Sequence, residues 1–237
     1  MASSFVICGY YKHLIIFTSL IIVHELGHYV TAKAVKFKVE KIIIYPYGGI
    51  TKLDDIIDKN ITNEVLVAIS GIIVQQIFFY LLTIIYKNNY INVYTYNIIC
   101  TYNKEIIMFN ILPIHPLDGS KILNLLINKV INYNSSNKIT LYISTITLLF
   151  IIINNLKKNN YSSIMTYVVL LYYVYKFKKE LKYYNKKLML EKYLYNNKFK
   201  KITIIKNNNF YKNRNHIIKL GKKYYKEKDY LKKYFKS

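Results

Sequence analysis

Tryptophan is absent from this chain of 237 residues, and it has only three prolines and two cysteines. Cys8 and Cys100 lie far apart, so they fit neither a CxxC metal motif nor a disulfide framework. Arg214 is the single arginine among 35 basic residues. This shortage, with the excess of isoleucine, asparagine, lysine and tyrosine, indicates nucleotide bias rather than a functional composition. Tyrosine would have to supply most of any aromatic belt at a membrane interface.

Acidic residues are also scarce, and the charge is unevenly distributed. The chain is 53% hydrophobic yet carries a formal net charge of +23, from 35 basic and 12 acidic residues. From Lys176 to the end there are 21 basic and 4 acidic residues, which is +17 of that total. An apolar body with a basic end argues against a soluble domain and is typical of a membrane protein with a cytosolic tail. Beyond charge, no feature points to nucleic acid, so we expect no nucleic-acid partner.

Five apolar segments predict the membrane topology, because a helix of about 20 residues spans a bilayer. They cover residues 5–32, 64–86, 93–128, 141–153 and 162–175. Four lysines directly after the first segment put its end in the cytosol, and Lys176 does the same for the fifth. Five spans satisfy both conditions and leave the N-terminus outside. We therefore expect an all-α polytopic membrane protein of the bacterial-type cell membrane, with a membrane domain at 1–177 and a basic cytosolic tail at 178–237.

Two stretches favour strands instead. Residues 42–50, IIIYPYGGI, combine β-branched side chains with a glycine pair, which predicts a short strand or hairpin. Residues 194–206 in the tail could form a small strand-rich module.

Residues 24–28 read HELGH, an HExxH sequence inside the first apolar segment. Positions four apart share one helix face, so His24 and His28 can bind one metal ion. Glu25 can then reach a metal-bound water. Each ionisable side chain in an apolar span costs a few kcal/mol unless it is paired or functional. The alternative is a plain helix with a satisfied polar cluster.

A zinc site of this kind needs a third protein ligand. Asp118, in the sequence FNILPIHPLDG at 109–119, is the best candidate. Alternatively, Asp118 caps a helix that begins at Gly119. His115 could also ligate or support a ligand, but its place between Pro113 and Pro116 favours packing in a turn. The remaining histidines, His13 and His216, are interpreted as interfacial or surface residues.

HELGH in an apolar helix followed by FNILPIHPLDG resembles the site-2 protease family of intramembrane zinc metalloproteases. The similarity is closest to its sporulation branch, the stage IV sporulation protein FB type. YPYGG at 45–49 matches a PFGG-like loop of that branch, and AISG at 68–71 matches a small-residue pair at the start of a helix. These four motifs occur in the same order as in the family, within residues 20–125.

The resemblance implies a role for each matching residue. His24, His28 and Asp118 would be the zinc ligands, and Glu25 the catalytic acid and base. Asn110, an amide beside the helix break at Pro113, would hold the substrate backbone or the oxyanion. The substrate-binding residues would be Tyr45, Gly48, Gly49 and Pro113, the first three in a membrane-reentrant strand.

The sequence also departs from the family. A transmembrane segment usually precedes the HExxH helix, but residues 1–12 are too short for one, so we expect about 30 further residues upstream. The rival is a five-span protein whose N-terminus lies outside. The loop at 51–63 is too short for a PDZ domain, and the tail is too short for the paired nucleotide-sensing domain of that branch.

We therefore predict an intramembrane zinc metalloendopeptidase that cleaves membrane-associated proteins, such as a sporulation or signalling precursor. Its partners would be the substrate and the lipid bilayer. One alternative is a catalytically silent scaffold or regulator of the same family, although the residues that carry the chemistry are intact. Another is a transporter or channel, which suits broken helices and intramembrane acids. Such a protein would not need HExxH spacing, and this sequence has no internal repeat.

Overall fold

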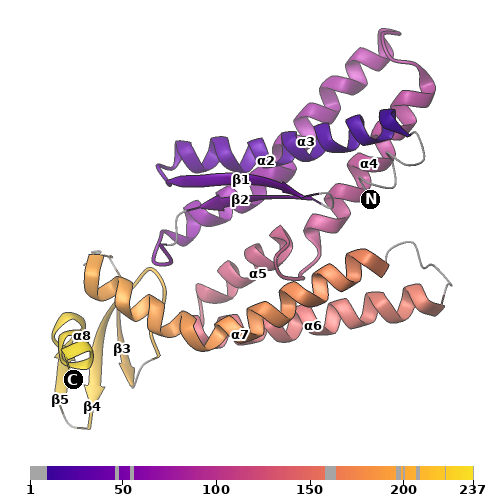
Figure 1. Ribbon diagram of the computed structural model, residues 1–237. Helices are drawn as coiled ribbons and strands as arrows, with labels where there is room; N and C mark the ends of the chain where they lie inside the picture. Colours follow the sequence, from indigo (N-terminus) through magenta and orange to yellow (C-terminus); the bar gives the residue numbers. More distant parts are fainter. Residues whose placement is uncertain are drawn as a thin grey trace. The chain divides into compact units, whose positions relative to one another are not determined.

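The computed structural model describes residues 10–45, 48–53, 56–157, 164–195, 199, 201–206, 209–221 and 223–236 (Figure 1). The chain forms two compact units. The first unit comprises Met1–Asp54 and Val65–Leu112, and the second comprises Asp55–Glu64 and Pro113–Ser237. Helix α3 (Ile61–Lys87) begins in the second unit and continues through the first.

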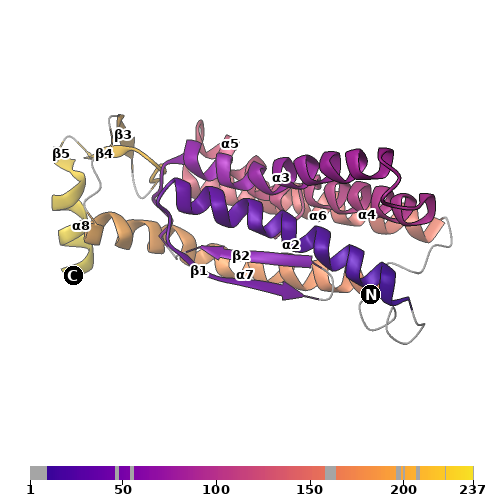
Figure 2. The same ribbon diagram turned by 90° about the horizontal axis from the view of Figure 1, so that it is seen from above.

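Among the described residues, three helices and a hairpin build the first unit. They are α2 (Tyr11–Ala34), most of α3, α4 (Val93–Ile111), β1 (Val39–Tyr45) and β2 (Gly48–Leu53). The hairpin lies along α2, as Figures 1 and 2 show from two directions. Phe17, Leu20 and Ile21 of α2 pack against Ile106 of α4. This apolar contact holds α2 and α4 together.

The outer faces of the long helices are apolar. Exposed side chains include Ile15, Leu26 and Val30 on α2, and Ile73, Ile77 and Leu81 on α3. Polar side chains of the same helices, such as His24 and Gln75, are buried. A soluble helix shows the opposite arrangement, so these faces are suited to contact lipid.

By length and composition, three of the described helices can cross a membrane. They are Tyr11–Ala34, Ile61–Lys87 and residues Tyr133–Leu156 of α6 (Tyr133–Lys157). The third predicted segment divides into α4 and a separate helix, and α4 exposes Lys104 and Glu105. The fifth forms the start of α7 (Ile164–Tyr195), in which lysines appear from Lys176 onward. The count of five spans therefore stays a prediction.

The strand expected at residues 42–50 is confirmed as a hairpin and is longer than predicted. β1 pairs antiparallel with β2, with Tyr45 opposite Gly48 and Ile44 opposite Gly49. Pairing extends to Val39 and Leu53 at the other end. Pro46 and Tyr47, and the side chain of Tyr45, lie outside the described residues.

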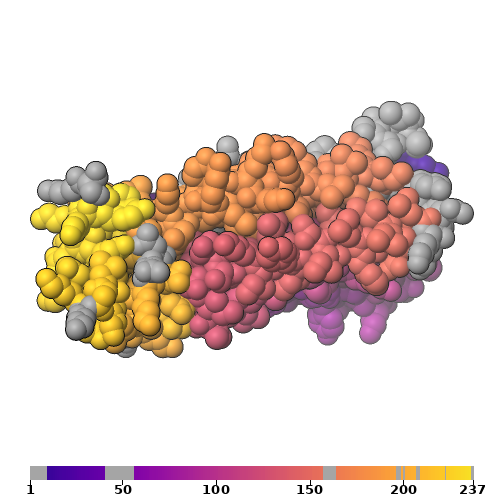
Figure 3. All heavy atoms as spheres, turned by 90° about the horizontal axis from the view of Figure 1, so that it is seen from below, coloured from indigo at the N-terminus to yellow at the C-terminus, as the bar shows by residue number. Residues whose placement is uncertain are grey.

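The second unit contains three helices that pack side by side, α5 (Asp118–Asn128), α6 (Tyr133–Lys157) and α7 (Ile164–Tyr195) (Figure 3). Polar contacts join α5 to α6: the Asn124 amide donates to Asn137 Oδ1 and to Thr140 Oγ1, both at 2.9 Å. Side-chain hydrogen bonds between packed helices fix their relative position more specifically than apolar packing alone.

The C-terminal end is folded and contains strands, in agreement with the strand-rich module suggested for residues 194–206, so the chain is mostly helical rather than all-α. β3 (Ile202–Lys206) pairs parallel with β4 (Asn215–Leu220), and β4 pairs antiparallel with β5 (Lys223–Lys226). Helix α8 (Glu227–Lys236) follows. The core of this C-terminal module combines Leu188 and Met189 of α7 with Phe210, Ile218 and Leu231. The predicted domain boundary at residue 178 lies inside α7 and stays a prediction.

His216, expected at the surface, is buried in this module. Its Nε2 accepts a hydrogen bond from the Tyr211 backbone N–H at 3.0 Å, so Nδ1 carries the proton toward Glu227 Oε2, 2.8 Å away. Burial lowers the pKa of His216, in agreement with a neutral ring. The sequence contains no pattern that would have placed this histidine inside.

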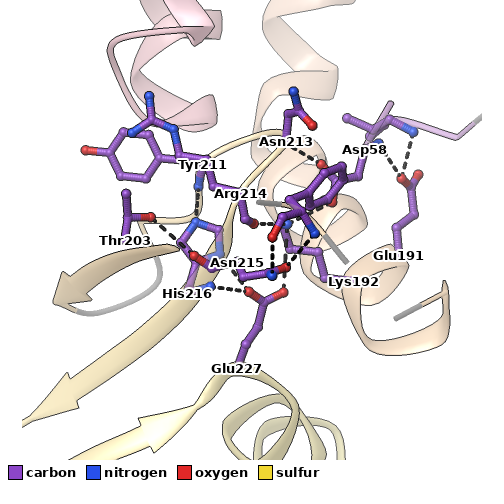
Figure 4. A network of polar contacts seen from close by, with 12 residues as sticks. Asp58, Glu191, Lys192, Thr203, Tyr211, Asn213, Arg214, Asn215, His216 and Glu227 are labelled. Carbon is purple, nitrogen blue, oxygen red and sulfur yellow. Dashed lines mark hydrogen bonds and ion pairs between the residues drawn. The ribbon is translucent and has the colours of Figure 1, made fainter. Parts of the chain in front are cut away.

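Buried ion pairs tie the segment before α3 to the C-terminal module (Figure 4). Lys192 Nζ lies 2.7 Å from Asp58 Oδ2, and both side chains are almost inaccessible, at 2% and 1%. Asp58 Oδ1 also accepts from the Asn213 backbone N–H at 2.8 Å. Glu191 accepts from the backbone N–H groups of Ile57 and Asp58. Residues 57 and 58 are thus held by Glu191 and Lys192 of α7 and by the backbone of Asn213.

Replacing Lys192 with methionine is expected to destabilise the module by about 3–5 kcal/mol, because it leaves the Asp58 carboxylate buried without its cation. Limited proteolysis of the membrane-bound protein should then release the C-terminal module at lower protease concentration. Lys186→Met, on an exposed position of the same helix, is the control and should match the unmodified chain. The double variant Asp58→Leu with Lys192→Met should recover much of the loss; equal protease resistance of all four proteins would contradict the assignment.

Candidate active site

The HExxH residues come together on the buried side of α2. His24, Glu25 and His28 are 2%, 5% and 5% exposed. The Nε2 atoms of the two histidines face each other at 3.2 Å. One potential ligand atom from each of the three residues lies within 4.8 Å of the others. The i, i+4 spacing therefore produces the arrangement expected from the sequence.

Neighbouring groups orient both imidazole rings. His28 Nδ1 lies 2.7 Å from the carbonyl oxygen of Val67, and His24 Nδ1 lies 2.9 Å from Gln75 Oε1. An oxygen of either kind can only accept, so each Nδ1 carries the hydrogen and each Nε2 presents a lone pair. Two lone pairs that face each other at 3.2 Å repel unless they share a cation. The donor set of this structure thus fits a bound metal ion.

Glycine on α3 leaves room beside these two nitrogens. A Cβ atom at Gly71 would lie 2.4 Å from His28 Nε2 and 2.8 Å from His24 Nε2. On the facing helix, a Cβ atom at Gly27 would lie 2.7 Å from the Ser70 carbonyl oxygen. The AISG sequence therefore has a physical reason: α3 approaches α2 so closely at the histidines that no side chain fits at position 71.

Asp118 belongs to the second unit and is the first residue of α5. Its side chain is buried, and Oδ1 pairs with Lys121 Nζ at 2.8 Å. Leu117 occupies the N-cap position. The helix thus begins at Asp118 rather than at Gly119, so the expected cap of a helix from Gly119 is not the observed arrangement. The role of Asp118 as third zinc ligand stays a prediction.

His115 packs in the turn, as its place between two prolines indicates. Its ring stacks on Phe177 with centroids 4.3 Å apart and 12° between the planes. Its backbone N–H donates to Ser144 Oγ at 3.2 Å, and that hydroxyl donates to the Pro113 carbonyl oxygen at 3.0 Å. The helix break predicted at Pro113 is also present, since α4 ends at Ile111.

Two other expected residues lie in or beside α4. The Asn110 side chain is half-buried and donates to the Ile106 carbonyl oxygen at 3.1 Å. Its contact with substrate stays a prediction. His13, expected at an interface, forms hydrogen bonds with the hydroxyl groups of Tyr102 and Tyr94, at 2.9 and 3.2 Å. Both tyrosines come from α4.

Sequence reasoning overlooked Gln75 and Asn103. Both are buried beside His24, and the Gln75 amide bridges from the histidine to Asn103. A glutamine inside an apolar span was the available signal, because polar residues at that depth are costly unless they have a task.

Comparisons with known proteins agree with this geometry. Residues 12–94 match the family model for peptidase family M50. The chain is 26% identical over 133 residues to stage IV sporulation protein FB of Bacillus subtilis, covering 56% of this chain and 46% of that protein. It is 33% identical over 129 residues to a zinc metalloprotease of Methanocaldococcus jannaschii, covering 53% of this chain and 37% of the relative. The chain thus spans less than half the length of either relative.

A solved structure is similar as well. The site-2 protease from Methanocaldococcus jannaschii matches with a TM-score of 0.57 and 26% identity, over 70% of this chain and 76% of that one. The family-model match over residues 12–94 includes the HExxH helix, the hairpin and α3. Sequence motifs, family model and fold together identify the chain as a relative of the site-2 proteases of peptidase family M50.

Proposed function

We propose that this chain is an intramembrane zinc metalloendopeptidase that cleaves membrane-associated proteins. The observation that carries the proposal is the buried group of His24, Glu25 and His28 in the middle of an apolar helix. Nε2 of each histidine would hold the zinc ion, and Asp118 would supply the third ligand. A relative named as a zinc metalloprotease supports the choice of metal.

Zinc, when bound, would act as a Lewis acid that lowers the pKa of a water molecule and polarises the peptide carbonyl. Glu25 lies between the two histidine ligands, where its carboxylate can accept a proton from that water. The same carboxylate then delivers the proton to the leaving amine, as a general acid. Asn110 would donate to the oxyanion. The burial of His24, Glu25 and His28 limits the access of bulk water to these groups.

The substrate has to be unwound near the site, because the carbonyl groups of a helix are already hydrogen bonded. The hairpin offers an edge for an extended segment, since β1 and β2 pair with each other in a two-stranded sheet. An added strand would gain main-chain hydrogen bonds there. We assign Tyr45, Gly48 and Gly49 to this surface, with Pro113 also in contact with substrate.

Asp118→Ala is expected to lose zinc, whereas His115→Ala keeps it. Asp118 is a buried carboxylate in the PLDG sequence, and His115 is engaged by stacking on Phe177. Metal analysis of both purified variants, alongside the unmodified protein, measures the difference. Zinc loss confined to the His115 variant would reverse the two assignments.

We also propose that the C-terminal module faces the cytosol. Export of a segment with +17 charge across an energised membrane is unfavourable, and the lysines after α2 give the same side independently. A reporter fused after Ser237 should be active in the cytosol. Activity confined to the outer side would overturn the orientation.

Comparison of membrane-protein fragments in cells that produce the chain or its Glu25→Gln variant tests the proposed activity. We expect one or more fragments that depend on Glu25, and these would also reveal whether the substrate is a sporulation or signalling precursor. Identical fragment sets, with the chain present in both membranes, would favour a silent scaffold instead.

A further inference from the structure

We propose that Gln75 and Asn103 are positioning residues that hold His24 in the tautomer able to bind metal. The inference rests on the proposed zinc function and names a relay that reaches the ligand from two other helices. Gln75 comes from α3 and Asn103 from α4. Neither residue would touch the metal or the substrate.

The contacts form a continuous line. His24 Nδ1 lies 2.9 Å from Gln75 Oε1, and Gln75 Nε2 donates to Asn103 Oδ1, also at 2.9 Å. Gln75 is fully buried and Asn103 is 5% exposed. A buried amide without partners costs about 1–3 kcal/mol, so the relay is an obligatory part of this interior rather than an incidental surface contact.

A backbone group indicates which way the Gln75 amide faces. Gln75 Nε2 is also 3.4 Å from the Asn103 carbonyl oxygen, an atom that can only accept. The NH₂ group of Gln75 therefore faces α4, and its oxygen faces His24. If the amide were reversed, its N–H would face Nδ1, the ring proton would move to Nε2, and the metal-binding lone pair would be lost.

His28 is held differently. Its Nδ1 donates to the Val67 carbonyl oxygen, a main-chain group that side-chain substitution does not remove. The two histidines therefore differ in how substitutions can affect them. His28 is oriented by a main-chain carbonyl group of α3, whereas His24 is oriented by the Gln75 side chain, which Asn103 of α4 holds in turn. The competing explanation is that the Gln75–Asn103 bond has a purely structural role and only holds α3 and α4 together.

Two substitutions at position 75 separate these explanations. Gln75→Leu removes the acceptor for His24 and the donor to Asn103 together. Gln75→Glu keeps an acceptor for His24, as in carboxylate–histidine–zinc arrangements, but gives up the NH₂ group that faces α4. A positioning role predicts that glutamate rescues the site and leucine does not. A purely structural role predicts that both variants lose zinc affinity to the same extent.

The readout is zinc affinity of the purified full chain, measured by competition with a chromophoric chelator. We expect Gln75→Leu to weaken zinc binding about 10- to 100-fold and Gln75→Glu to stay within a few-fold of the unmodified protein. The matched control is Gln76→Leu, the same change on the next, exposed residue, which should leave affinity unchanged. Asn103→Leu leaves Gln75 in place but removes the 2.9 Å bond that holds its amide, so that only the long 3.4 Å contact remains, and it should also weaken binding.

Each outcome decides the matter. Unchanged affinity in Gln75→Leu, equal losses in Gln75→Leu and Gln76→Leu, or equal losses in Gln75→Leu and Gln75→Glu would overturn the inference while the zinc function stands. If Gln75→Leu does not fold, Asn103→Leu and Gln75→Glu carry the test, and normal affinity in the former or loss in the latter overturns it. An unmodified chain that binds no zinc would overturn the proposed function itself.

Discussion

Replacing Glu25 with glutamine is expected to abolish peptide-bond cleavage while zinc stays bound. Glutamine has nearly the same shape as glutamate but cannot accept the proton of the attacking water. General acid–base catalysis typically contributes about 10²- to 10⁴-fold to the rate, so turnover should fall by at least that range. His24 and His28 keep their partners Gln75 and Val67, so metal content should not change.

The measurement pairs turnover of a reconstituted membrane substrate with metal analysis of the same preparation. Glu105→Gln, which makes the same change on an exposed position of α4, is the matched control and should cleave normally. Near-normal turnover of the Glu25 variant would show that the HExxH mechanism is wrong for this chain. Loss of zinc from the variant would instead make Glu25 part of the metal site.

The second large effect is expected from Gly71→Ala. A methyl group at this position would stand 2.4 Å from His28 Nε2 and 2.8 Å from His24 Nε2, separations so short that the methyl group or the rings would have to shift. In an ordinary helix interior this substitution adds about 1 kcal/mol of helix propensity. Here the methyl group occupies the space next to both metal-binding nitrogens, so we expect zinc binding and cleavage to be lost together.

Zinc per chain and helix content of the purified Gly71→Ala variant distinguish a local clash from misfolding. We expect little zinc with helix content near that of the unmodified protein, and normal zinc in the exposed-site control Gln76→Leu. Full zinc occupancy in the alanine variant would mean that α3 lies farther from the histidines than the structure places it.

Local spacing explains most of what the sequence predicted correctly. HELGH required only the helical repeat to place His24, Glu25 and His28 on one face. The hairpin followed from β-branched residues around a glycine pair, and the end of α4 followed from Pro113. Each of these inferences uses residues within about ten positions of one another, where backbone geometry alone relates them.

Long-range partners were beyond such reasoning. Gln75 and Asn103 are 28 positions apart, and Asp58 and Lys192 are 134 apart. No periodicity relates these positions, so their pairing becomes visible only when the helices are packed. The burial of His216 has the same origin, since the parallel pairing of β3 and β4 and the helix α8 create its surroundings.

Membrane topology illustrates a different difficulty. Residues 93–128 resemble one long apolar segment, but the chain ends α4 at Ile111 and begins α5 at Asp118. A hydropathy argument sums over a window and cannot locate such a break unless a proline marks it. The prolines gave the position of the break. Composition does not distinguish a membrane-spanning α4 from an interfacial one, because this helix mixes apolar residues with the exposed Lys104 and Glu105.

Removal and return of the metal test the central claim most directly. The purified chain in lipid, assayed on the substrate found by fragment comparison, should lose cleavage when a chelator removes its zinc. Cleavage should return on addition of zinc and should stay absent when zinc is returned to the Glu25→Gln variant. Undiminished cleavage by protein shown to be free of metal would contradict the account.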